Sequence, residues 1–197
     1  MSESVKIIVE KQRTVHTYAE LWHASECVLS VGIQNPIGSS WQFLSSIVLT
    51  AFTFEAYLNH VGAATFECWD DLDKLSPWSK LELLCERFTV AFPQGKGARP
   101  LQTVANVLDF RNTIAHGKSE ELKVKPVHRT TENYHAAYME RPLALWESLI
   151  QTEEFAIRAR EDVEVVLQAL HDARPGEKEG LFTFGMALYS AGVLPTP

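Results

Sequence analysis

The longest apolar run of the chain, from Trp41 to Trp69, constrains the fold most. A helix over about residues 40–69 would be about 43 Å long at 1.5 Å per residue. Apolar side chains cover almost its whole circumference, which is typical of the central helix of a bundle. Polar residues interrupt the run, among them Ser45, Ser46, Thr50, Glu55, Asn59 and His60. We therefore expect a buried core helix rather than a membrane span.

Helical spacing of apolar residues also predicts helices over about 14–31, 77–92, 101–116 and 144–173. Residues 5–9 suit either a short strand or the start of the first helix, and residues 118–141 have no regular pattern. The sequence thus predicts an all-α fold. We expect a compact bundle of about five helices with a long central helix and an irregular segment after the helix at 101–116.

The length of 197 residues predicts a single domain over 1–197, with its helical core at about 14–173. Residues 174–180 are linker-like, because they are rich in glycine, proline and charge. The tail from Leu181 to Tyr189 is too apolar to stay in solvent. We expect it to dock on the body of the domain or on another subunit.

Composition narrows the function classes. The net charge of −7 argues against a broad nucleic-acid-coating surface, although a small local RNA site stays compatible with it. Cys27, Cys68 and Cys85 are widely spaced, which predicts buried thiols in a reducing compartment rather than a disulfide framework. The first residues have no signal-peptide pattern. We expect a cytoplasmic protein that does not associate with a membrane.

Two charged residues occupy apolar positions in predicted helices. Arg111 falls inside the arc of the helix at 101–116 that also holds Leu101, Val104 and Leu108. A guanidinium group cannot be buried without a partner. Glu55 lies among apolar residues of the central helix, so we predict that Glu55 and Arg111 are close. The pair is either a buried structural ion pair or a device in which Glu55 orients Arg111 for a bound phosphate.

Asn112 and His116 lie one turn apart on the same face of the helix that carries Arg111. Gly117 follows directly, and we expect it to end the helix in the left-handed conformation. The helix is therefore expected to bring an arginine, an asparagine and a histidine to one sheltered place.

The stretch Arg111-Asn112-Thr-Ile-Ala-His116 resembles the R-x4-6-H motif of the HEPN superfamily. These proteins are compact helical domains, and many are metal-independent endoribonucleases of toxin–antitoxin and antiviral defence systems. The segment from Ala51 to Asn59 resembles the helix that carries an acidic and an amide residue beside the motif helix in such proteins. The resemblance covers about residues 40–170. It implies RNA as substrate, a twofold homodimer with facing motif helices and, in a toxin–antitoxin setting, a protein antitoxin.

The residue types of the motif suit RNA cleavage by the substrate's own 2′-hydroxyl. His116 would take or give a proton, and Arg111 would stabilise charge on the pentacovalent phosphorus. Asn112 would hold the phosphate or set the tautomer of the histidine, with Glu55 and Asn59 in support. No metal or cofactor is expected, since no carboxylate cluster is evident. One arginine and one histidine are a small catalytic set, and a twofold dimer would supply both an acid and a base.

The segment after the motif holds four candidate RNA contacts, Lys118, Lys123, Lys125 and Arg129. A solvated loop is the alternative interpretation of these residues. Two alternative functions also stay open. One is a non-catalytic HEPN-like interaction module, because a fold can outlast its activity. The other is a helical domain that binds a nucleotide or another small molecule.

Overall fold

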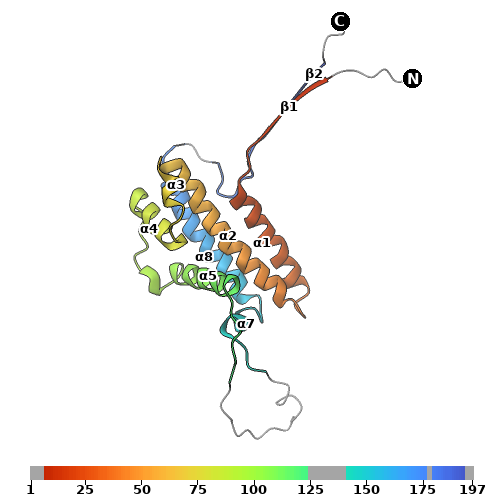
Figure 1. The fold of residues 1–197 in the computed structure, drawn as a ribbon, viewed down its shortest axis with the longest axis vertical. Coiled ribbons are helices and arrows are strands. Elements are labelled where there is room, and N and C mark those ends of the chain that lie inside the picture. The colour runs from red at the N-terminus through yellow and green to blue at the C-terminus, as the bar shows by residue number, and fades with distance from the viewer. Residues whose placement is uncertain (1–6, 124–140, 177–178, 194–197) are drawn as a thin grey trace, which may run out of the picture.

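The computed structural model describes residues 7–123, 141–176 and 179–193, and this part of the chain is mainly helical (Figure 1). Its α-helices are α1 (Thr17–Gln34), α2 (Ser40–Thr65), α3 (Trp69–Leu72), α4 (Pro77–Phe88), α5 (Leu101–Ala115), α7 (Leu145–Leu149) and α8 (Glu154–Ala173). A short 3-10 helix, η1 (Gly95–Gly97), precedes α5. Strands β1 (Ile7–Arg13) and β2 (Ala187–Val193) form a two-stranded antiparallel sheet. The predicted helical character is confirmed, and the sheet is a departure from the predicted all-α class.

Helix α2 lies at the centre and packs against α1, α4, α5 and α8. The hydroxyl groups of Thr50, Thr53 and Thr65 reduce the cost of burial because they bond to carbonyls within the helix, as Thr50 does to Ser46 at 2.8 Å. The Ser46 hydroxyl is buried without a hydrogen-bond partner among the described residues. The helix ends at Thr65, four residues before the predicted end. Trp69 starts α3 instead, and its ring lies against Gly62, where any Cβ atom would collide with the indole.

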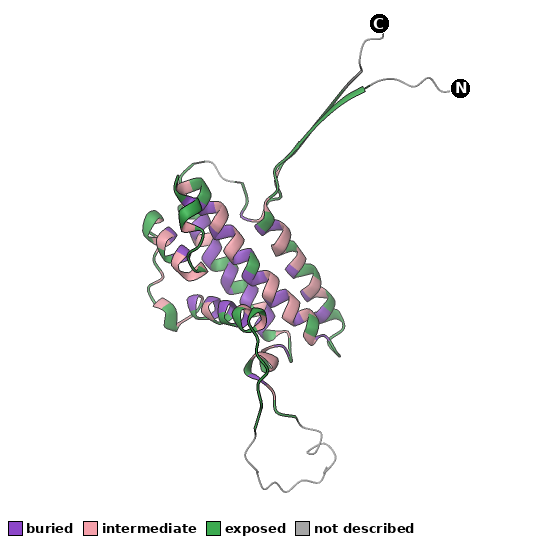
Figure 2. Ribbon diagram, viewed as in Figure 1, coloured by how far each residue is buried: buried purple, intermediate pink, exposed green. Residues whose placement is uncertain are grey.

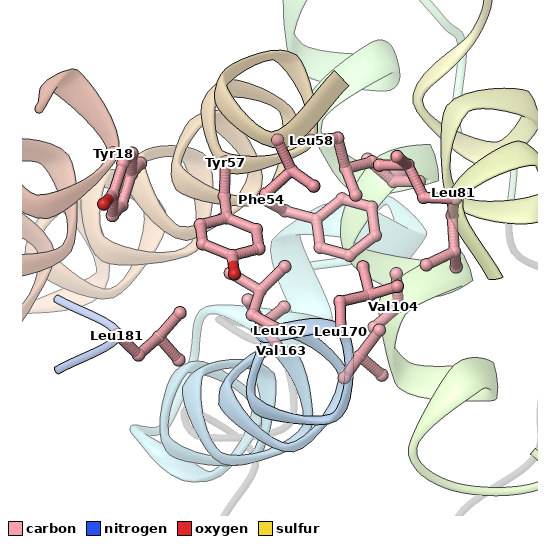
Figure 3. Packing of buried hydrophobic residues seen from close by; sticks show 14 of the residues in the cluster. Tyr18, Phe54, Tyr57, Leu58, Leu81, Val104, Val163, Leu167, Leu170 and Leu181 are labelled. Atoms are coloured by element: carbon pink, nitrogen blue, oxygen red, sulfur yellow. The ribbon is translucent and has the colours of Figure 1, made fainter. Parts of the chain in front are cut away.

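The main core forms where five segments meet around α2 (Figure 3). Phe54, Tyr57 and Leu58 of α2 are fully buried. They pack with buried side chains of α1, α4, α5, α8 and the C-terminal tail, including Tyr18, Leu81, Val104, Val163, Leu167, Leu170 and Leu181. This packing fixes α4 and α5 against the same helix, which brings their charged residues together.

The predicted single helix over 144–173 is wrong, because α7 ends at Leu149 and α8 begins at Glu154. The side-chain Nε2 of Gln151 donates to the carbonyl of Glu147 at 2.9 Å. A continuous helix would use that carbonyl for the backbone N–H of residue 151, so the side chain competes with helix propagation. Ile150 is buried at the break.

The C-terminal tail docks on the helices and then leaves them. Leu181 is buried, and Phe182 stacks on Trp22 with ring centroids 4.2 Å apart, which confirms the predicted docking. Beyond this point β2 pairs with β1, with Arg13 opposite Ala187. The resulting ribbon projects away from the helices, and its described side chains are exposed (Figure 2). The ambiguous segment at 5–9 is thus strand from Ile7 onward.

The cysteine prediction is partly wrong. Cys27 and Cys68 are exposed, whereas Cys85 is half-buried and burial raises the pKa of its thiol to about 11.

Among the described residues, none of the helices combines the length and apolarity that crossing a bilayer requires.

Candidate functional site

Arg111 of α5 and Glu55 of α2 form an ion pair, in which Nη2 of the arginine donates to Oε2 of the glutamate. The predicted proximity of the two residues is confirmed. The Arg111 side chain is 18% exposed and that of Glu55 is 28% exposed, so the pair lies at the edge of the core. The guanidinium carbon also lies 5.8 Å from the ring centroid of Phe52, which is itself partly exposed.

A second cation, Lys80 of α4, completes this cluster and was missed by the sequence prediction. Lys80 is 1% exposed, and its Nζ lies 3.8 Å from Oε1 of Glu55. The single carboxylate of Glu55 thus pairs with two cations, so the cluster has a net positive charge. The sequence contains a signal for Lys80, namely its position among the apolar residues of α4. Lys80 is buried on the same side of α4 as Leu81 and Leu84, and Arg111 likewise lies among the apolar residues of α5.

Arg111 keeps donors that the protein does not use. Its Nη1 donates to Oδ1 of Asn112 at 3.0 Å, while Nε is buried without a partner among the described residues. A guanidinium carries five N–H groups, so N–H groups on its terminal nitrogens remain for an anion. Oδ1 of Asn59 is likewise buried and unpaired within the described part of the chain. No described hydrogen bond links Asn59 to Glu55 or Arg111.

Asn112 and His116 are exposed, so the expectation of one sheltered place is wrong for both. Helix geometry gives the reason, because both lie on the outer face of α5 while Arg111 turns toward α2. The imidazole of His116 makes no hydrogen bond or ring contact with other described residues. Its backbone N–H donates to the carbonyl of Asn112 at 2.9 Å.

Gly117 follows the end of α5 as predicted, but its predicted left-handed conformation is wrong. His116 itself ends the helix with φ −114° and ψ 17°, and Gly117 is not among the glycines with positive φ. A residue in this bridge region of backbone space suffices to close α5. The backbone of His116 is therefore fixed by a hydrogen bond, while its imidazole has no partner among the described residues.

Two surface hollows flank the outer face of α5. The first, of about 210 Å³, lies between α5 and the start of α4 and is lined by Ser76, Pro77, Trp78, Ala105, Leu108, Asp109 and Asn112. The second, of about 410 Å³, lies toward α7 and is lined by Asn106, Asp109, Phe110, Thr113, Glu120, Leu145, Trp146 and Leu149. Asp109 borders both hollows, and each contains one tryptophan.

The structure describes two of the four predicted basic RNA contacts. Lys118 and Lys123 are exposed, and Nζ of Lys123 lies 3.0 Å from a carboxylate oxygen of Glu121. Lys125 and Arg129 lie outside the described residues. The neighbouring glutamate offsets part of the positive charge that this segment would offer to RNA.

A second polar cluster, of three histidines and two tyrosines, lies where α1, α2 and α8 meet the C-terminal tail. The hydroxyl of Tyr57 lies 3.1 Å from Nδ1 of His171, whose Nε2 lies 2.8 Å from the carbonyl of Glu179. The imidazole of His60 lies near the imidazole of His16 and the phenol ring of Tyr18. Burial, and then the charge of Arg174, lowers the pKa of His60 to about 4.

Neither cluster has the ligands of a metal centre. In the described ranges, no three histidine, cysteine or acidic side chains are grouped so that they could hold a metal ion. The contacts of the histidine–tyrosine cluster tie the tail to the helices, so a structural role accounts for them.

Comparison with protein-family models, with curated proteins and with solved structures finds no match for this chain. The resemblance to the HEPN superfamily thus rests on the motif residues themselves.

Proposed function

We propose that the protein is a metal-independent endoribonuclease of the HEPN type, with the compact helical bundle of that superfamily. One observation supports this most. Arg111 is held by Glu55 at the edge of the core, and the same helix presents Asn112 and His116 on its outer face. An anchored guanidinium and a free imidazole are the groups that phosphodiester cleavage through a 2′-hydroxyl requires.

In the proposed reaction the 2′-oxygen attacks phosphorus and the bond from phosphorus to the 5′-oxygen breaks. The products are a 2′,3′-cyclic phosphate and a free 5′-hydroxyl. One His116 takes the 2′-hydroxyl proton, and a second His116 gives a proton to the leaving oxygen. Arg111 stabilises the negative charge of the pentacovalent phosphorus with its remaining N–H groups.

The proposal includes a twofold homodimer with facing α5 helices. Arg111 and His116 of one chain point in different directions, so a second chain would supply the missing group to each site. Exposed apolar side chains beside α5 suit such an interface. Phe52 is 41% exposed next to Arg111, and Leu145 is 82% exposed at the start of α7.

A non-catalytic interaction module is the second candidate, and a specific observation favours it. Arg111 is already engaged by Glu55 and by Asn112, and Lys80 joins the same carboxylate. Such a network can be purely structural. Under this alternative, His116 only caps α5. For either function, the toxin–antitoxin or antiviral setting and a protein antitoxin stay predictions from the resemblance to the HEPN superfamily.

An assay with purified protein separates the two functions. The protein is incubated with an RNA and with DNA of the same sequence in the presence of a metal chelator. We expect cleavage of the RNA only, and loss of cleavage in His116→Ala. His23→Ala is the matched control, since His23 is an exposed histidine on α1. Equal activity of wild type and His116→Ala, or no cleavage by any of them, contradicts the nuclease.

A further inference from the structure

The smaller hollow beside α5 has the size and walls of a subsite for one ring system. Pockets for whole small-molecule ligands measure about 300–1,000 Å³, and this one measures about 210 Å³. Pro77, Trp78, Ala105 and Leu108 give it apolar walls, while Ser76, Asp109 and Asn112 contribute polar groups. An aromatic heterocycle that carries hydrogen-bonding groups on one edge fits this combination.

Trp78 is fixed in place at this hollow. Its indole Nε1 donates to Oε1 of Glu82 at 2.9 Å, and Nζ of Lys96 lies 4.4 Å from the ring centroid. Lys96 also pairs with Glu82 at 2.8 Å, so the three side chains hold one another. Nucleobases of single-stranded RNA stack on aromatic side chains of proteins, and Trp78 supplies such a ring at the hollow.

Asp109 decides which base the hollow would favour. Its carboxylate is exposed and has no hydrogen-bond or ion-pair partner among the described residues. An ionised carboxylate only accepts hydrogen bonds. Guanine presents two adjacent donors, N1–H and the N2 amino group, on its Watson–Crick edge, whereas each other base presents a donor at one position there. Two carboxylate oxygens therefore match guanine best.

Asn112 connects the hollow to Arg111. It lines the hollow, and its Oδ1 accepts the hydrogen bond from Nη1 of Arg111 at 3.0 Å. Asn112 thus joins the hollow to the guanidinium that is proposed to hold the phosphate. We propose that this hollow is a guanine subsite that places a guanosine of single-stranded RNA beside Arg111, an inference that rests on the proposed function.

Binding of mononucleotides tests the subsite without any need for cleavage. Affinities of 5′-GMP and 5′-AMP are measured by calorimetry on the full chain. We expect wild type to bind 5′-GMP about tenfold more tightly than 5′-AMP, as for one good bidentate base contact. Asp109→Asn should remove this preference, and Trp78→Leu should weaken the binding of both nucleotides.

A control variant tests whether the nucleotides bind in the smaller hollow or in the second hollow beside α5. Trp146→Leu changes the second hollow, which Asp109 also borders, and should leave both affinities unchanged. Equal binding of the two nucleotides by wild type, or an unchanged preference in Asp109→Asn, overturns the guanine subsite. Circular dichroism confirms that each variant is folded before its affinities are interpreted.

The failure of this inference and that of the nuclease are distinguishable. RNA cleavage that depends on His116, without any preference for guanosine and without an effect of Asp109→Asn, removes the subsite and keeps the nuclease. Binding of 5′-GMP with the expected pattern but no RNA cleavage removes the nuclease and keeps a guanine-binding hollow.

Discussion

Glu55 is the residue on which the candidate site depends, because it is the carboxylate shared by Arg111 and Lys80. A buried cation without a counter-charge is costly, and removal of one partner of a buried ion pair costs roughly 3–5 kcal/mol. Both cations depend on Glu55, whereas neither cation depends on the other. If Lys80 is removed, Glu55 still neutralises Arg111.

Substitutions at Glu55 and Lys80 should therefore have unequal effects. We expect Glu55→Gln to lower the free energy of unfolding by about 2–3 kcal/mol, below the value for a fully buried pair because 28% of the side chain is exposed. Lys80→Met should change it by less than about 1 kcal/mol, since a methionine fills similar space among apolar neighbours. Urea unfolding at neutral pH measures both. A larger loss in Lys80→Met than in Glu55→Gln would contradict this order.

The imidazole of His60 should make stability depend on pH. Its pKa in the folded protein is about 4 against an ordinary value of 6.5, because of burial and then of the charges of Arg174, His16 and His171. The unfolded chain therefore binds this proton first as the pH falls. Stability from this group is full above about pH 6.5 and is lost progressively down to about pH 4.

Urea unfolding between pH 7 and pH 4 measures the effect. The wild-type protein should lose more stability over this range than His60→Gln, because the glutamine does not titrate. The difference between the two proteins should develop mainly below pH 6.5. Parallel pH profiles for the two proteins would contradict a half-buried His60 that stays neutral in the folded protein.

At the scale of elements, α5 shows what a local pattern can predict. Its apolar period gave the helix over 101–116 to within one residue, and the misplaced charges predicted the contact between Glu55 and Arg111. The predicted contact follows from the requirement that a buried charge needs a partner. The same requirement applies to Lys80, which is buried on α4 and lies beside Glu55.

Other elements could not be predicted, because their causes are not local. Strand β2 pairs with β1 from the opposite end of the chain, and neither segment specifies that partner. The break between α7 and α8 depends on one side-chain hydrogen bond from Gln151. The exposure of His116 depends on what surrounds α5, including any second chain.

The ribbon of β1 and β2 should be the least protected hydrogen-bonded element. Its described side chains are exposed on both faces, and an isolated two-stranded ribbon is only marginally stable in water. Amide hydrogen exchange followed by NMR measures this. We expect the ribbon amides to exchange orders of magnitude faster than those of the buried part of α2. Protection in the ribbon equal to that in α2 would mean that another molecule covers it.

At the scale of the whole molecule, the net charge of −7 argues against a broad RNA-binding surface, and the proposed local site needs two chains. Sedimentation should give a homodimer for the wild type. Phe52→Asp should shift it to monomer, because it replaces exposed apolar surface at the proposed interface by a carboxylate that association would have to desolvate. Val31→Asp is the control, since Val31 is similarly exposed on α1. A monomeric wild type would contradict the dimeric site.

The most direct measurement uses one short RNA and the same strand with a single 2′-deoxynucleotide at the cleaved position. Mass spectrometry identifies the ends of the products in the presence of a chelator. We expect a 2′,3′-cyclic phosphate and a 5′-hydroxyl from the RNA, no cut at the substituted position, and no product from Arg111→Ala or His116→Ala. Cleavage at the deoxynucleotide, or products that persist in both variants, would contradict it.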